Sequence, residues 1–354
     1  MASTSLPSSE MSFRINIPDD KIAFLYRKLS LPAPLDELLK LGRDYGVPLA
    51  DLQRLLARWR DGYDWKKYEQ ELNEELPQFK KDIHVDGFGT LGIHYMHKKS
   101  TVTGAIPLLF VHGWTGSVIE VRKILPLLTE GSPSFPSFHV VAFSLPGYGF
   151  SEAPRKKGFQ ISQFAETGHK LMLSLGYEEY VTQGGDVGFF ITRRSAKVSE
   201  GNKARHFDYA RLPESMPPYS LQSPWLYFFN PPAHYTSAEK AGLERTERFM
   251  RSKAGYFKNQ PSQAQTFETN LTDSPVGLLA WIYGKLLNWS DSYSWEDDEV
   301  LTWVSIYWFS TPGPAASLKV YNEMVQASSR APAKTTIPQG WSYFPREVIN
   351  MPRS

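Results

Sequence analysis

Short apolar runs alternate with stretches of helical periodicity through the middle of this chain. Residues 106–111 and 138–143 are almost continuously apolar, as is typical of strands that are buried on both faces. Residues 118–128 and 161–175 predict helices, and residues 180–182 predict another strand. This alternation predicts a parallel, doubly wound α/β sheet. Functional residues in such sheets lie in the loops at the carboxyl ends of the strands.

Helical segments are expected on both sides of this region. Near the start of the chain, an amphipathic helix carries apolar residues at Leu52, Leu55, Leu56 and Trp59, and a β-hairpin follows around residues 86–89. After about residue 213 the chain becomes rich in proline and aromatic residues. Helices and a last strand are then expected within residues 238–253, 276–287, 297–325 and 335–344.

This pattern divides the chain into four segments. Residues 1–78 form a helical arm, and residues 79–213 form the first part of an α/β core. Residues 214–333 form a helical lid inserted into that core. Residues 334–354 supply the remaining part of the core.

Composition excludes several classes of protein. The 354 residues contain 39 Lys and Arg against 37 Asp and Glu, and this balance argues against a nucleic-acid partner. The absence of cysteine excludes disulfides, thiolate metal sites and a cysteine nucleophile. The chain begins without a basic and apolar leader, and no apolar run approaches the ~20 residues of a membrane span. We therefore expect a soluble, cytoplasmic protein without a transmembrane anchor.

The segment Gly184-Gly185-Asp186-Val187-Gly188 directly follows a predicted strand. Its spacing is that of a nucleophile elbow, in which flanking glycines permit a sharp turn from strand to helix. An aspartate in the nucleophile's place is already an anion at neutral pH, and it can attack an sp³ carbon to form an ester. A structural glycine turn capped by an aspartate would give the same pattern. The motif alone leaves both interpretations open.

Two further turns follow predicted strands of the same sheet. The first, residues 112–117 (HGWTGS), lies where α/β-hydrolases supply one backbone N–H of the oxyanion hole, the other coming from the residue after the nucleophile. These positions are Trp114 and Val187. We expect His112 to be a hydrogen-bonded structural histidine. The second turn, residues 145–151, is expected to be structural.

At these motifs the chain resembles the microsomal-type epoxide hydrolases, which include the juvenile hormone epoxide hydrolases. The resemblance runs over nearly the whole chain and implies an α/β-hydrolase fold with a helical N-terminal arm and a helical lid. Dehalogenases and ordinary esterases of this fold lack that arm. Its most specific motifs are residues 59–65 and 77–79, the loops of His112 and Asp186, residues 273–278 with Trp281, and residues 306–308.

The resemblance assigns a role to individual residues. Asp186 corresponds to the nucleophile, Tyr256 and Tyr321 to the two lid tyrosines that protonate the epoxide oxygen, and Glu347 to the acid that orients the catalytic histidine. The implied reaction converts an apolar epoxide and water to a vicinal diol without a metal or cofactor. Family members act on xenobiotics, insect hormones and secondary metabolites. A homodimer is left open.

The chain departs from the family pattern in several places. The family's catalytic histidine follows the acid in a Gly-Gly-His turn, whereas the last histidine here is His234, and the family's final strand and helix are expected to be missing with it. Val187 replaces the usual tryptophan and Thr115 the usual proline, and neither change removes a backbone N–H. Without the histidine base, we expect Asp186 to be alkylated but its ester to resist hydrolysis.

Three alternatives accompany this interpretation. A haloalkane dehalogenase also uses an aspartate nucleophile, but Val187 stands where that chemistry typically places a tryptophan that holds the halide. A catalytically dead or ligand-binding remnant of the family would account for the missing histidine. A cyclisation enzyme that reuses the lid tyrosines is the third.

Overall fold

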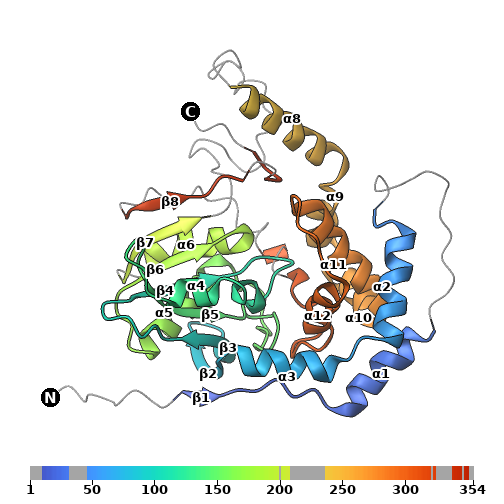
Figure 1. The fold of residues 1–354 in the computed structure, drawn as a ribbon, viewed down its shortest axis with the longest axis horizontal. Coiled ribbons are helices and arrows are strands. Elements are labelled where there is room, and N and C mark those ends of the chain that lie inside the picture. The colour runs from blue at the N-terminus through green and yellow to red at the C-terminus, as the bar shows by residue number, and fades with distance from the viewer. Residues whose placement is uncertain are drawn as a thin grey trace.

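The computed structural model describes residues 10–31, 46–198, 201–207, 236–319, 322–323, 337–344 and 347–350. In these residues, eight strands form one mixed sheet in the order β1-β2-β3-β5-β4-β6-β7-β8 (Figure 1). The strands are β1 (Met11–Ser12), β2 (Gln78–Val85), β3 (Gly89–Lys98), β4 (Ile106–Val111), β5 (Phe138–Phe143), β6 (Tyr180–Gly184), β7 (Asn202–Phe207) and β8 (Gln339–Trp341).

Some helices lie against this sheet, and the others form a separate layer beside it (Figure 1). Those of the core are the short 3₁₀ helix η1 (Val118–Val121), α4 (Leu125–Thr129), α5 (Ile161–Ser174) and α6 (Asp186–Val198). Three lie in the N-terminal arm, namely α1 (Asp19–Leu29), α2 (Leu49–Asp61) and α3 (Trp65–Glu75). The lid contains α8 (Ser237–Ser252), α9 (Gly255–Ser262), α10 (Ala264–Asp273), α11 (Pro275–Trp289) and α12 (Asp297–Trp308). None of the helices in the described ranges is both long and apolar enough to cross a membrane.

The parallel part of the sheet aligns the loops that carry the candidate site. Strands β5, β4, β6, β7 and β8 are parallel neighbours, whereas β1, β2 and β3 are joined to one another and to β5 by antiparallel pairing. Val111 pairs with Gly184, Gly184 with Phe207, and Phe207 with Trp341. The carboxyl ends of these four strands therefore lie in one row, and the predicted parallel α/β sheet is confirmed.

Two predicted helices are shorter than the sequence pattern suggested. The helix expected over 118–128 is divided into η1 and α4, because Pro126 stands in the first turn of α4 and could not continue a helix that began earlier. In the segment expected to be helical over 297–325, α12 ends at Trp308, and residues 318–319 and 322–323 are helical again. Pro312 and Gly313, whose φ is 102°, follow soon after Trp308, and these two residue types do not continue a helix.

The sequence pattern also missed four elements. Strand β1 spans two residues in a segment that was expected to be helical. Strand β7 has the sequence NKARHF, whose polar residues conceal its place in the sheet. Helices α9 and α10 span only 8 and 10 residues, too few to give a clear helical period. The last strand, expected within 335–344, is confirmed as the short strand β8.

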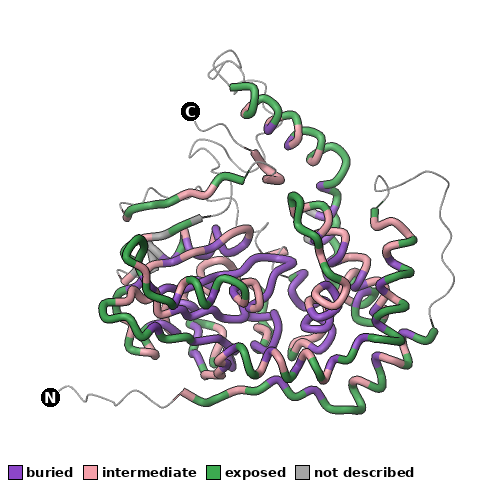
Figure 2. Tube along the Cα trace, viewed as in Figure 1, coloured by how far each residue is buried: buried purple, intermediate pink, exposed green. Residues whose placement is uncertain are grey.

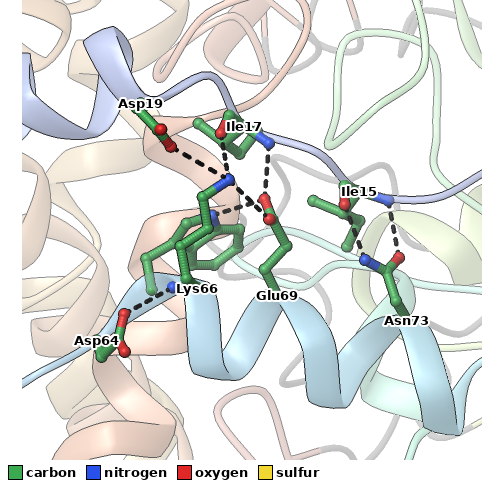
Figure 3. A network of polar contacts seen from close by, with 8 residues as sticks. Ile15, Ile17, Asp19, Asp64, Lys66, Glu69 and Asn73 are labelled. Carbon is green, nitrogen blue, oxygen red and sulfur yellow. Dashed lines mark hydrogen bonds and ion pairs between the residues drawn. The ribbon is translucent and has the colours of Figure 1, made fainter.

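Polar contacts fix the start of the arm to helix α3. The carboxylate of Glu69 accepts hydrogen bonds from Ile17 N at 2.6 Å and from Lys66 Nζ at 3.0 Å (Figure 3). The amide of Asn73 forms two 2.8 Å hydrogen bonds with the backbone of Ile15. The bonds to Ile15 and Ile17 satisfy backbone groups of the segment between strand β1 and helix α1.

The arm helices pack against the lid helices, although the two groups are far apart in the sequence (Figure 1). Trp59 of α2 is fully buried in the same apolar cluster as Leu301 of α12. Ion pairs surround this contact: Lys28–Asp273, Arg54–Asp297 and Arg58–Asp298. Figure 2 shows mainly buried residues along α12 and mainly exposed ones along α8. Because exposed ion pairs stabilise little, burial of apolar side chains is what holds the arm to the lid.

Candidate active site

Asp186 lies at the sharp turn between strand β6 and helix α6. Its φ is 48°, a left-handed value that is rare for a residue other than glycine. A Cβ atom on Gly184 would lie 2.6 Å from the carbonyl oxygen of Gly188, and one on Gly188 would lie 2.1 Å from that of Val111. Only glycine fits at both positions. The predicted elbow is therefore present, and its strain is concentrated at Asp186.

The loop after β4 holds the carboxylate of Asp186. Because β4 and β6 are parallel neighbours, their following loops meet, and the backbone N–H of Trp114 donates to Asp186 Oδ1 at 2.9 Å. A Cβ atom on Gly113 would lie 2.6 Å from Asp186 Cβ, so glycine permits this close approach. Val187 follows at the start of α6 and is buried, and the first N–H groups of a helix are available to an anion.

His112 joins two loops of the site through both of its ring nitrogens. Nδ1 lies 2.9 Å from Gly113 O, and Nε2 lies 3.2 Å from the backbone nitrogen of Leu145. A carbonyl can only accept and a backbone N–H can only donate, so the ring is neutral with its proton on Nδ1. Burial lowers the pKa of His112 to about 4. The expectation of a structural histidine is confirmed.

Tyr256 reaches this site from the lid. It is buried near the start of α9, and its ring stacks on Trp114 with centroids 6.0 Å apart and an interplanar angle of 23°. Its ring also lies 5.4 Å from that of Trp289 on α11. Trp114 therefore contacts Asp186 through its backbone and Tyr256 through its side chain.

Comparisons with known proteins match both halves of this arrangement. Residues 10–121 match the family described as "Epoxide hydrolase N terminus", and residues 106–200 match the "alpha/beta hydrolase fold". Epoxide hydrolase 1 of Sus scrofa is 32% identical over 96% of this chain and 79% of its own length. The chain belongs to the epoxide hydrolase family. Juvenile hormone epoxide hydrolase 1 of Ctenocephalides felis is 30% identical over 95% of this chain and 75% of its own.

A solved structure supports the same assignment at the level of the fold. The epoxide hydrolase of Aspergillus niger superimposes with a TM-score of 0.83 and 31% identity, covering 98% of this chain and 87% of its own. The α/β-hydrolase fold inferred from the sequence is thus confirmed.

Two residues of the lid support the loop that holds Asp186, and neither was assigned a role from the sequence. Trp303 Nε1 donates to Thr115 O at 2.6 Å, and the hydroxyl of Tyr307 donates to Gly116 O at 2.6 Å. Both residues lie on α12, four positions apart and so on one helix face. These bonds fix two carbonyls of the loop and thereby the direction of its N–H groups. The spacing of these two aromatic donors is visible in the sequence, but it does not show which groups they bond to.

Tyr148 lies close enough to Asp186 for the charge of that carboxylate to affect its hydroxyl. Tyr148, in the turn after β5, is buried, and its hydroxyl has no hydrogen-bond partner in the described part of the chain. Burial raises its pKa well above the ordinary value, and the charges of Asp186 and Glu120 raise it further. Tyr148 is therefore a neutral phenol in the electrostatic field of two carboxylates.

The other two predicted site residues lie towards the carboxyl end of the chain. Glu347 follows strand β8, whose end is level with that of β6 in the sheet. Its carboxylate accepts a hydrogen bond from Val348 N at 2.9 Å. Tyr321 lies outside the described residues. The structure thus brings Trp114, Asp186, Val187 and Tyr256 together, whereas no described contact joins Glu347 to them.

Proposed function

We propose that this epoxide hydrolase opens apolar epoxides through a covalent ester on Asp186. The observation that carries the proposal is the hydrogen bond from Trp114 N to Asp186 Oδ1, formed at a residue with a φ of 48°. A backbone held in a rare conformation at a loop junction favours a functional role. The bond also distinguishes the two carboxylate oxygens, because Oδ1 accepts it from residues 112–117. We call these residues the oxyanion loop.

In the proposed first step, Asp186 Oδ2 attacks one carbon of the epoxide ring. The C–O bond of the ring breaks, and its electron pair goes to the epoxide oxygen, which takes a proton from Tyr256, with Tyr321 as the second donor. A positioned phenol suits this task because the ring would otherwise open to an alkoxide. Oδ1 becomes the carbonyl oxygen of the ester, held by the N–H groups of Trp114 and Val187.

The substrate class follows from the aromatic surroundings of Tyr256. Its ring contacts those of Trp114, Trp289 and Phe249. Side chains of this kind bind apolar groups through their large apolar surface. We therefore propose a small apolar epoxide as the substrate, with water as the second reactant.

In the proposed second step, water attacks the carbonyl carbon of the ester and releases the diol. This step needs a base, and Glu347 is the acid expected to orient a histidine for it. The structure describes seven of the eight histidines, and each of the seven has a hydrogen-bond partner: residues 84, 94, 97, 112, 139, 169 and 206. We therefore expect these 354 residues to form the ester faster than they hydrolyse it.

Intact-mass spectrometry after incubation with styrene oxide tests both steps, with Asp186→Asn as the control. We expect a persistent adduct of one epoxide on the wild type, located on the peptide that contains Asp186, and none on the control. Diol without an adduct would refute slow hydrolysis. A single turnover in heavy-oxygen water then tests the ester itself, because an ester route puts an oxygen of Asp186 in the first diol.

The second candidate function is binding of an apolar epoxide without reaction. This alternative is favoured because the described histidines already form hydrogen bonds with other groups, whereas hydrolysis of the ester needs a base. Under this alternative, wild type and Asp186→Asn would both be stabilised against heat by styrene oxide, and neither adduct nor diol would form. That result would overturn the proposed ester mechanism.

A further inference from the structure

Lys285 of α11 lies among three aromatic rings of the lid. Its Nζ is 4.4 Å from the ring centroid of Tyr256, 4.7 Å from that of Trp281 and 5.7 Å from that of Trp289. A cation within about 6 Å of a ring face is attracted by the electrons of the ring. Tyr256 thus contacts two very different groups, the Lys285 ammonium and the ring of Trp114.

No carboxylate in the described ranges lies within ion-pair distance of Lys285, and the charged groups on the elements packed around it have partners of their own. On α10, Glu268 pairs with Lys319 at 3.1 Å. At the end of α8, Lys253 donates to Asn288 at 3.1 Å. Asp186, beyond Trp114, accepts the bond from the oxyanion loop. The aromatic rings are therefore the main neighbours of the Lys285 charge.

We propose that Lys285 is a positioning residue whose positive charge makes Tyr256 a stronger proton donor to the opening epoxide. A phenol that gives up its proton becomes negatively charged, so the attraction between ammonium and ring grows as the proton leaves. An interaction that is stronger in the transition state than in the ground state accelerates the step. This inference rests on the proposed role of Tyr256, and it adds a residue that acts through that tyrosine.

The proposal predicts a specific pH profile. Burial lowers the pKa of Lys285 to about 8. Below that pH the side chain is a cation and supports proton donation, whereas above it the amine is neutral and the support is lost. Ester formation by the wild type is therefore expected to fall as the pH rises through about 8.

The test measures the rate of adduct formation with styrene oxide by rapid quenching and intact-mass spectrometry, from pH 6 to 10. Lys285→Met removes the charge at similar length, and we expect a rate about tenfold lower at pH 7, with an unchanged half-saturating epoxide concentration. Lys285→Arg keeps the charge at every pH of the series. Its rate at pH 7 should therefore equal that of the wild type, and the fall in rate near pH 8 should be absent. Lys253→Met is the matched control, because it removes a neighbouring cation that contacts Asn288.

Two results would overturn the proposal. One is a wild-type rate of adduct formation that does not fall near pH 8. The other is a Lys285→Met rate equal to that of Lys253→Met, while the wild type still forms the adduct that Asp186→Asn lacks. In that case ester formation on Asp186 stands and the role of Lys285 fails.

Absorbance titration gives a readout that does not need the reaction. The Tyr256 titration is the difference between a variant and its Tyr256→Phe counterpart. It is measured in the Lys285→Arg and Lys285→Met backgrounds, because Lys285 itself is neutral at the high pH where a phenol titrates. We expect a lower Tyr256 midpoint in the Lys285→Arg background than in the Lys285→Met background. Equal midpoints would refute the inference even if no epoxide reacts.

Discussion

Replacing Gly113 by alanine tests whether the loop after β4 must approach Asp186, the proposed nucleophile, as closely as it does. The new Cβ would lie 2.6 Å from Asp186 Cβ and 2.8 Å from Asp186 Oδ1. An ordinary contact begins at 3.4 Å, so the aspartate and the loop must separate by about 0.8 Å. That shift stretches the bond from Trp114 N and turns the carboxylate. A displacement near 1 Å costs on the order of 100-fold in rate.

The assay is again the rate of adduct formation with styrene oxide, together with urea denaturation. We expect adduct formation about 100-fold slower in Gly113→Ala and an unfolding free energy lower by about 1–3 kcal/mol. Gly255→Ala is the control, since its Cβ would meet nothing within 4 Å and it lies at a helix start. A Gly113→Ala rate within about threefold of wild type, corresponding to less than ~1 kcal/mol, would refute the reasoning.

Three further predictions concern stability and are measured by urea denaturation. Gly188→Ala brings a Cβ atom to 2.1 Å from a backbone carbonyl oxygen, and we expect it to cost about 3 kcal/mol or to prevent folding. Glu69→Ala leaves the N–H of Ile17 without its acceptor and should cost about 1–3 kcal/mol. Burial lowers the pKa of His94 to about 3 and that of His112 to about 4, from 6.5. Their contribution to stability is present above pH 6.5 and is lost as the pH falls, by about 2 kcal/mol for each histidine between pH 7 and pH 5.

Matched control variants separate these effects from a nonspecific loss of stability. Glu71→Ala removes a more exposed carboxylate of the same helix, and we expect a change within about 0.5 kcal/mol. His94→Gln should reduce the loss of stability between pH 7 and pH 5 by about half, whereas His84→Gln, at an exposed position, should leave it unchanged. Equal pH dependence in both variants would contradict the assignment to buried histidines.

The elbow could be predicted from the sequence because its constraints are local. Gly184 and Gly188 each face a backbone atom that leaves no room for a Cβ atom. Such steric limits act over a few residues and therefore appear as a fixed spacing. The apolar face of α2 was predictable for a similar reason, since Leu55 and Trp59 lie on one face and are fully buried.

The support around the site depends on contacts between distant segments and could not be predicted in this way. Trp303 and Tyr307 bond to the loop after β4 from a helix nearly 190 residues later, at separations of 188 and 191 residues. Lys285 is the one charged residue of the apolar helix α11, but the sequence does not show that α9 brings Tyr256 against it. The roles of Glu347 and Tyr321 came from the family resemblance alone and stay predictions.

The packing of the arm on the lid has a consequence for synthesis on the ribosome. Arg54 and Asp297 are separated by 243 residues, which takes roughly 10–50 s to translate at about 5–20 residues per second. During that time the apolar face of α2, including Trp59, has no lid helix to cover it. The apolar face of α2 is thus made long before the lid that covers it, and we expect a nascent chain to bind chaperones that recognise exposed apolar helices.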